Sequence, residues 1–110
     1  MRKIAILAAL FVFGSLFIGC NISPDATFKV IYMDNGSTSG YPPTDPNQYK
    51  YGEEALIFDK NTLLKQGYAF ENWNTHVNGS GNSYIPGDKK IIEGPVFLYA
   101  MWVPILHTEV

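Results

Sequence analysis

The stretch GYAFENWNTHVNGSGNSY (residues 67–84) decides how this chain folds, because its two largest rings break the alternation of a regular strand. Phe70 and Trp73 are three positions apart, so an unbroken strand would direct them to opposite faces. Either both faces are covered, or a β-bulge between the rings brings them to one side. Asn72 lies between them, and asparagine tolerates positive φ better than most residues do. We therefore expect both rings in the core and Asn72 at the bend.

The second part of the stretch predicts a loop tip between two strands. It contains the run NGSGN (residues 78–82), and Asn-Gly is the strongest short turn signal. We expect a tip that tolerates substitution at Ser80 and Asn82. A ligand of this stretch would use the tip and Tyr84, whereas Trp73 and Trp102 are expected to be buried anchors.

Several other segments predict short strands. VFLYAMW (residues 96–102) is the strongest, because seven apolar residues follow one another without a breaker, and Pro104 should end the strand. FKVIYM (residues 28–33) is rich in aromatic and β-branched residues, and Phe28, Val30 and Tyr32 should share one face. Residues 49–58 predict one short strand on each side of Gly52, and residues 85–92 predict a turn and a weak strand.

The remaining segments predict a loop and a short helix. Residues 41–49 contain three prolines, which a central strand cannot use, so this part should be an extended loop or an edge. In DKNTLLKQG (residues 59–67), Asp59 or Asn61 can cap a helical turn or short helix that Gly67 ends. The pattern predicts an α+β, mostly β domain with three to five short strands and one short helix.

The N-terminus predicts export. Arg2 and Lys3 precede an uncharged apolar run, residues 4–18. As a helix these fifteen residues would span roughly 22 Å, which is shorter than the ~30 Å hydrocarbon core of a bilayer. A basic start and a short apolar run are typical of a secretory signal peptide.

Cys20, the only cysteine, follows this run directly, so no disulfide can form within the chain. The sequence FIGC (residues 17–20) resembles the lipobox of bacterial lipoproteins, although Phe17 stands where Leu is usual. The resemblance implies cleavage before Cys20 and a diacylglycerol on its thiol, with acyl chains such as palmitate as the membrane anchor. The alternative is an ordinary signal peptide or signal anchor, with Cys20 incidental.

The expected organisation has four parts. Residues 1–19 are a lipoprotein signal peptide, residues 20–27 the lipidated cysteine and its tether, residues 28–102 one domain and residues 103–110 a tail. Without the signal peptide the chain has six lysines and ten acidic side chains, a balance of −4. Because no basic patch occurs, we expect no nucleic-acid partner, and membrane affinity should come from the lipid.

Three blocks in order resemble the Listeria–Bacteroides repeat, the internalin-type B-repeat of bacterial surface proteins. They are FKVIYMDNGSTSG (residues 28–40), KQGYAFENWNTHVNGSGNSYIPGD (residues 65–88) and VFLYAMW (residues 96–102), with Asn72 where the family usually has Gly. The resemblance implies a β-grasp-like fold, in which a small mixed sheet packs on a short helix. It also implies a non-enzymatic spacer, adhesive or interaction module outside the cell. The family's repeats usually occur in tandem, whereas this chain carries one.

The residues offer little for catalysis or metal binding. His76 and His107 have no second ligand at metal-binding spacing, and Glu53 and Glu54 are better explained as a solvated turn. No catalytic or nucleotide-binding motif occurs. The oxygen-rich runs DNGSTSG (residues 34–40) and NGSGNS (residues 78–83) lack the spacing of a Ca²⁺ loop and are better explained as turns. We therefore expect no enzyme activity, no cofactor and no metal.

Tyrosines in loop-rich stretches are the candidate partner-binding residues, since exposed rings stack on sugars or anchor proteins. They are Tyr41, Tyr49, Tyr51 and Tyr84. The alternative is that these rings close over a small core, and an edge strand could also pair with a partner chain. The predicted role is a lipid-anchored, extracytoplasmic module of the bacterial envelope, at the outer membrane or cell surface. Its partner would be an envelope or host protein, or a glycan.

Overall fold

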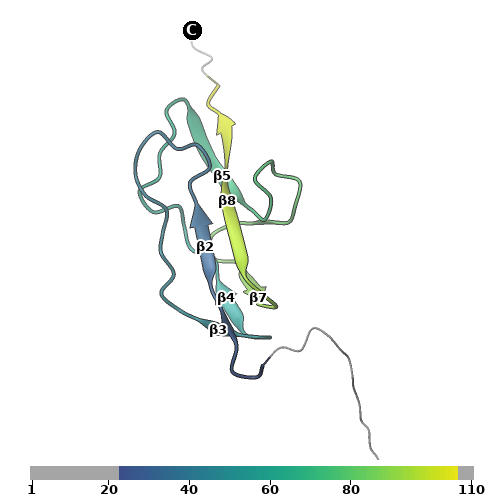
Figure 1. Cartoon of the computed structure of the whole chain (residues 1–110). Helices are drawn as coiled ribbons and strands as arrows, with labels where there is room; N and C mark the ends of the chain where they lie inside the picture. Colours follow the sequence, from purple (N-terminus) through teal and green to yellow (C-terminus); the bar gives the residue numbers. More distant parts are fainter. Residues whose placement is uncertain (1–22, 107–110) are drawn as a thin grey trace, which may run out of the picture.

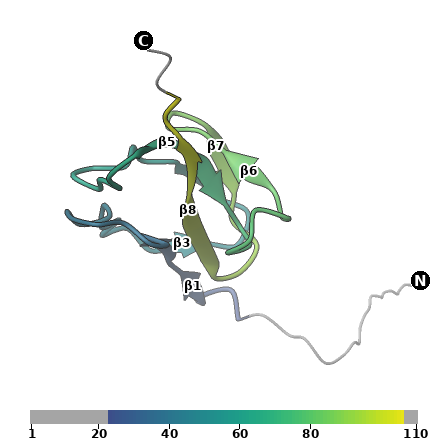
Figure 2. The ribbon, with the colours of Figure 1, turned by 90° about the horizontal axis from the view of Figure 1, so that it is seen from above.

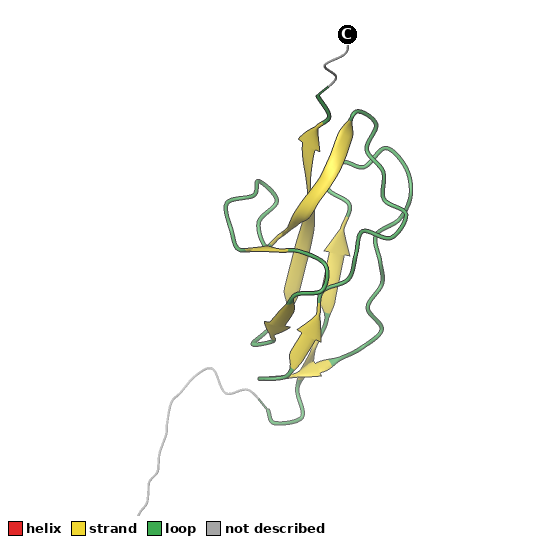
Figure 3. Cartoon of the chain, turned by 180° about the vertical axis from the view of Figure 1, so that it is seen from behind, coloured by secondary structure: helices red, strands yellow, loops and turns green. Residues whose placement is uncertain are grey.

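The computed structural model describes residues 23–106, and this part of the chain consists of strands, turns and loops (Figures 1 and 3). The predicted signal peptide, Cys20, His107 and the end of the tail lie outside the described residues. The strands are β1 (Thr27–Phe28), β2 (Val30–Met33), β3 (Tyr49–Lys50), β4 (Glu54–Leu56), β5 (Tyr68–Asn74), β6 (Ser83–Tyr84), β7 (Lys89–Ile91) and β8 (Val96–Pro104).

A four-stranded mixed sheet in the order β2-β8-β5-β6 forms the centre of the domain. β2 runs parallel to β8, and β5 runs antiparallel to both β8 and β6. Two small antiparallel pairs, β1-β3 and β4-β7, complete the fold. In the view from above, β5 lies beside β8, while β1 and β3 lie on the other side of β8 (Figure 2). The described chain enters at the β1 end and leaves at the opposite end, where β8 stops (Figure 1).

The short helix expected at residues 59–67 is absent, so the α+β class and the expected β-grasp-like packing of a sheet on a helix are wrong. The mostly-β character is confirmed, and the described domain is all-β. The Asp59 carboxylate does accept a hydrogen bond from the Asn61 amide (2.8 Å), but Asn61 adopts φ 58°, which a helix cannot contain. Leu64 instead exchanges backbone hydrogen bonds with Ser39, of 3.0 and 3.1 Å. Pairing with a distant segment therefore takes the backbone groups that a helix would have used.

The predicted bulge in β5 is present. Phe70 pairs with Trp102 and Asn72 pairs with Met101, which leaves Glu71 as the extra residue. The expectation of a positive φ at Asn72 is wrong. In the described chain the non-glycine residues with positive φ are Asn35 and Asn61. The bulge therefore needs no left-handed residue, as in bulges whose first residue stays near the right-handed helical region.

The core lies between one face of the central sheet and the loops that carry the small strand pairs. Trp73 is fully buried. Its ring meets Tyr32 and Phe70 edge-on, at centroid distances of 4.8 and 5.1 Å, and its indole N–H donates to the Phe58 carbonyl at 2.9 Å. Trp102 is only partly buried, so the expectation of two buried tryptophans holds for Trp73 alone. The other buried apolar residues are Val30, Tyr32, Tyr49, Ala55, Ile57, Leu63, Ile92, Val96, Leu98 and Ala100.

The remaining predicted strands agree with the structure apart from their ends. The strand predicted at residues 28–33 is divided into β1 and β2, because β1 pairs with β3 whereas β2 pairs with β8. Between them, the Lys29 carbonyl accepts a hydrogen bond from the Val96 amide at 3.1 Å. β8 continues to Pro104, which pairs with Tyr68. The proline-rich segment runs along the free edge of β2 as a loop, with one bridge between Ile31 and Thr44. This arrangement blocks that edge against pairing with another chain.

Candidate ligand-binding groove

Strand β8 is apolar on both faces, although the described domain covers only one of them completely. Val96, Leu98 and Ala100 point into the core and are buried. Phe97 and Tyr99 alternate with them and therefore lie on the opposite, outer face of the sheet. Phe97 is 48% exposed. A strand that is apolar on both sides usually lies between two layers, so this face has the character of a contact surface.

The residues opposite β8 in the sheet extend this outer face. Ile31 pairs with Phe97 and Met33 pairs with Tyr99, and Met33 is 40% exposed. On the other side Asn74 pairs with Tyr99. The outer face is thus an apolar strip, which consists of Ile31, Met33, Phe97, Tyr99 and Met101.

The loop of residues 75–82 folds over one end of this strip. The Asn74 side chain holds the loop: its Oδ1 accepts from the amides of His76 and Gly81, both at 2.9 Å. Its Nδ2 donates to the carbonyls of Gly79 and Gly81, at 3.2 and 3.3 Å. Asn74 is therefore buried with its polar atoms satisfied. The predicted loop tip is confirmed, and Asn74 is the residue that fixes it.

Asn35 fastens the same loop from the other side of β8. Its Nδ2 donates to the carbonyls of Val77 (3.1 Å) and Ala100 (2.8 Å). The loop consequently crosses above Met101, and an added Cβ on Gly79 would lie 3.2 Å from the Met101 sulfur. This cover leaves the part of the outer face around Phe97 open.

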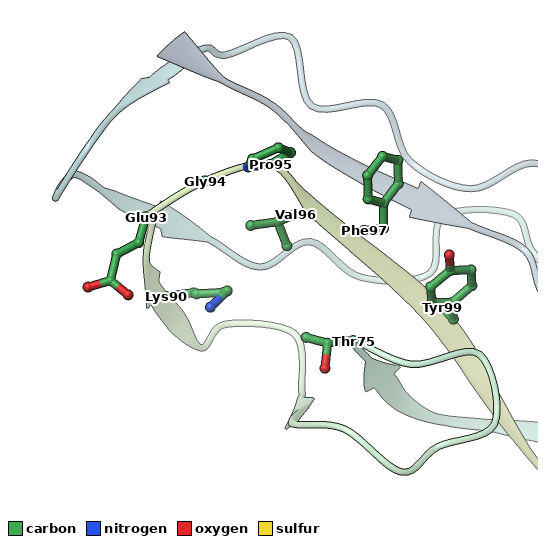
Figure 4. Close-up of a pocket in the computed structure, with 8 residues that line it drawn as sticks. All are labelled: Thr75, Lys90, Glu93, Gly94, Pro95, Val96, Phe97 and Tyr99. Carbon is green, nitrogen blue, oxygen red and sulfur yellow. The ribbon is translucent and has the colours of Figure 1, made fainter. Parts of the chain in front are cut away.

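A groove of about 420 Å³ lies at this open part, and we call it the β8 groove. Its walls are formed by Thr75 at the start of the loop, Lys90 of β7 and the aromatic residues Phe97 and Tyr99 (Figure 4). The turn of residues 93–95 closes one end. The volume falls in the range of small-molecule sites, about 300–1,000 Å³.

The charges at the groove are distributed unequally. Lys90 extends beneath Val96 toward Thr75, whereas the Glu93 carboxylate points away from both residues (Figure 4). The Lys90 ammonium also lies 5.2 Å from the centroid of the Tyr84 ring, which is a cation–π contact. This contact holds the ammonium at the groove, so the wall presents a positive charge together with apolar rings.

The four tyrosines predicted from the sequence occupy different environments. Tyr41 and Tyr51 are exposed, at 77% and 56%, and lie in separate loops. Tyr84 is partly buried against the core, and its ring contacts the Lys90 ammonium, which lines the groove. Tyr49 is buried, and its hydroxyl donates to Asp45 Oδ2 at 2.6 Å, so it is placed as a structural residue. The fold does not gather the four into one site.

Two buried tyrosines have unusual pKa values. Burial raises the pKa of Tyr32 to about 12, and the negative charge of Asp45 contributes, although the hydrogen bond from the Phe58 amide acts in the opposite direction. Burial also raises the pKa of Tyr49, and its hydrogen bond to Asp45 acts in the same direction. Both hydroxyls therefore stay protonated at neutral pH and stabilise the fold as hydrogen-bonding groups.

The sequence pointed to Tyr84 but missed Phe97, Tyr99 and Lys90. An available signal was the continuous apolar character of residues 96–102, which predicts that both faces of the strand contact something. His76, which has no metal-binding partner in the sequence, lies in the covering loop. Residues 23–106 contain no group of three or more His, Cys, Asp or Glu side chains that could hold a metal ion.

Comparisons with known proteins identify the domain. Residues 28–101 match the profile of a family described as the Listeria-Bacteroides repeat domain. Two proteins of Evansella cellulosilytica are also similar. One, named "Putative Gly-rich membrane protein", is 37% identical over 101 residues, and the other, named "Putative membrane protein", is 36% identical over 76 residues.

The matched regions are 83% and 68% of this chain but 11% of each relative. This chain therefore corresponds to a small part of those proteins. No solved structure matches it. Within residues 23–106, no helix has the length and apolar character that a membrane span requires.

Proposed function

Because this chain belongs to the Listeria-Bacteroides repeat family, we propose that it is a non-enzymatic interaction module, anchored by lipid on the outside of a bacterial membrane. The observation that carries the proposal is the position of Gly19-Cys20, between an apolar run and the start of the repeat domain at residue 28. The relatives named as membrane proteins support an envelope location. The partner would be an envelope or host protein, or a glycan.

The tether sets where such a module would work. Cys20 and the first residue of β1, Thr27, are seven positions apart. Even fully extended, a segment of that length would span at most about 25 Å, so the β1 end of the domain would stay close to the bilayer surface. The opposite end, where β8 stops, would point away from the membrane.

Fractionation of cells that express the full chain tests this proposal. The parent should be found in the membrane fraction and should become soluble only with detergent. The Cys20→Ala variant should lack acyl chains, with its signal peptide uncleaved. Incorporation of labelled palmitate by the parent and not by Cys20→Ala is the expected result. Equal incorporation by both proteins, or by neither, would contradict lipid attachment at Cys20.

A second candidate function is an adhesive or glycan-binding module that uses exposed tyrosines. The exposure of Tyr41 and Tyr51 favours it, whereas Tyr49 is unavailable for contact. Binding of the full chain, purified in detergent, to a glycan array tests this function. Loss of a bound glycan in Tyr41→Ala or Tyr51→Ala, with an unchanged melting temperature, is the result it predicts. Unchanged binding by both variants would exclude these rings.

A further inference from the structure

We propose that the β8 groove binds one or two rings of an acidic polysaccharide, such as a polymer that contains uronic acid. This inference rests on the proposed interaction module and names its ligand and its site. The proposed site is the β8 groove and not the exposed loop residues Tyr41 and Tyr51. Two properties of the groove support it: its aromatic wall and the positive charge of Lys90.

The aromatic wall suits the apolar face of a sugar ring. Phe97 is 48% exposed and lines the groove beside Tyr99. A pyranose has one face of C–H groups that can pack on such rings, while its hydroxyls stay at the edge. Burial of an aromatic surface of this kind supplies the apolar part of binding.

The charge at the groove indicates an anionic ligand. The Lys90 ammonium contacts the Tyr84 ring at 5.2 Å, and the Glu93 carboxylate that could neutralise it points elsewhere (Figure 4). A carboxylate on the ligand would complement this charge and make a charge-assisted hydrogen bond. The domain as a whole is acidic, so an anionic polymer would be repelled from most of its surface and would favour this place.

The pairing of β8 defines where the groove lies. β8 pairs with β2 along Val96–Tyr99, whereas its pairing with β5 begins only at Tyr99. The groove is therefore beside the part of β8 that β5 does not cover, where Phe97 and Lys90 line it. Ring contacts and one positive charge are what the protein offers there to a sugar, and a peptide added to this edge as a strand is the competing occupant.

The test is calorimetric titration of the full chain, purified in detergent, with a trimer of galacturonic acid. The neutral trimer of galactose is the matched ligand. We expect the acidic trimer to bind at least tenfold more tightly than the neutral one, and more weakly as salt increases. Equal binding of the two trimers, or no binding of either, would overturn the proposal.

Variants assign the site. Phe97→Leu keeps an apolar side chain but removes the ring, and it should weaken binding at least tenfold with little change in melting temperature. Lys90→Gln should remove the preference for the acidic trimer. Lys89→Gln is the matched control, because Lys89 is exposed on the same strand but alternates to the other side. Tyr41→Ala is the control for an exposed ring elsewhere, and both controls should bind as the parent does.

The outcomes separate this inference from the proposed function. If Phe97→Leu and Lys90→Gln both bind like the parent, the groove assignment is wrong. If Tyr41→Ala or Tyr51→Ala loses binding while the groove variants keep it, the module binds sugar through its loops, and the groove is again excluded. If Cys20 carries no lipid but the acidic trimer binds at Phe97 and Lys90, the proposed lipid anchor is wrong and the assignment of the ligand site to the β8 groove is supported.

Discussion

Phe70 and Trp73 lie on the same face of β5, with ring centroids 5.1 Å apart, although they are three positions apart in the sequence. Glu71 is the extra residue that makes this possible, because its insertion shifts the register against β8 by one position. Both rings consequently reach the core, and Asn72 and Asn74 fall on the outer face. One bulge thus determines both the packing of the core and the side chain that holds the covering loop.

Replacing Trp73 with alanine should nearly unfold the domain. Truncation of a buried Trp costs about 3–5 kcal/mol, through lost transfer free energy and the cavity that remains. Small domains have only about 5–15 kcal/mol of total stability. Urea unfolding measures the difference. Trp102→Ala should cost less, because Trp102 is partly exposed.

The loop tip supplies the control for the Trp73 prediction. Ser80 and Asn82 are exposed, so Ser80→Ala and Asn82→Ala should change the free energy of unfolding by about 0.5 kcal/mol or less. If Trp73→Ala were as stable as these variants, the assignment of Trp73 to the core would be incorrect.

Two glycines with the same backbone conformation should respond differently to alanine. Gly40 and Gly52 have φ of 82° and 90°. An added Cβ on Gly40 would lie 1.9 Å from the Thr62 carbonyl oxygen, whereas nothing lies within 4 Å of one on Gly52. Gly52→Ala should cost about 1–2 kcal/mol from the left-handed conformation alone. Gly40→Ala should cost at least about 2 kcal/mol more, since backbone must move.

The same unfolding experiment on both glycine variants isolates the contact between residues 40 and 62. Because both variants carry the same cost of the left-handed conformation, the difference between their free energies of unfolding measures the clash of the added Cβ at residue 40 with the Thr62 backbone. Equal losses would show that the loops of residues 34–41 and 60–67 are not packed together as described.

Tyr32 should make the domain lose stability at high pH. Its pKa is raised from 10.0 to about 12 in the folded protein. The protonated form is therefore favoured by folding, and this contribution is complete below pH 10 and disappears as pH rises through 12. A shift of this size corresponds to an upper bound of roughly 3 kcal/mol.

Thermal melting of the parent and of Tyr32→Phe between pH 8 and about 12 checks this expectation. The variant should be less stable at pH 8, because the Phe58 amide loses its hydrogen-bond acceptor, a cost of about 1–3 kcal/mol. Its stability should then fall less steeply with pH than that of the parent. Parallel pH profiles would mean that Tyr32 does not contribute to the alkaline transition.

Local sequence signals predicted the parts of the fold that local chemistry controls. The bulge in β5, the loop tip after Asn78, the strand at Val96 and the short strands beside Gly52 follow from parity, turn residues and apolar runs. The helix prediction failed at residues 59–67, where backbone pairing between Leu64 and Ser39 decides the structure. No local pattern contains that contact.

The candidate site was harder to predict because exposure depends on what covers a surface. The apolar run at residues 96–102 indicated two buried faces, and only the fold shows that Phe97 is left half exposed. Tyr49 illustrates the opposite case. It lies beside prolines and polar residues in the sequence, yet its ring closes the core and its hydroxyl meets Asp45. Side chains of the same type therefore separate into core and surface only once the strands are paired.

Intact mass spectrometry of the full chain, purified from membranes, reads out the proposed anchor at Cys20. We expect a mature chain that begins at Cys20 and carries a diacylglycerol on the thiol, with residues 1–19 removed. A chain that retains Met1 and has a free thiol at Cys20 would contradict the proposed lipid-anchored module.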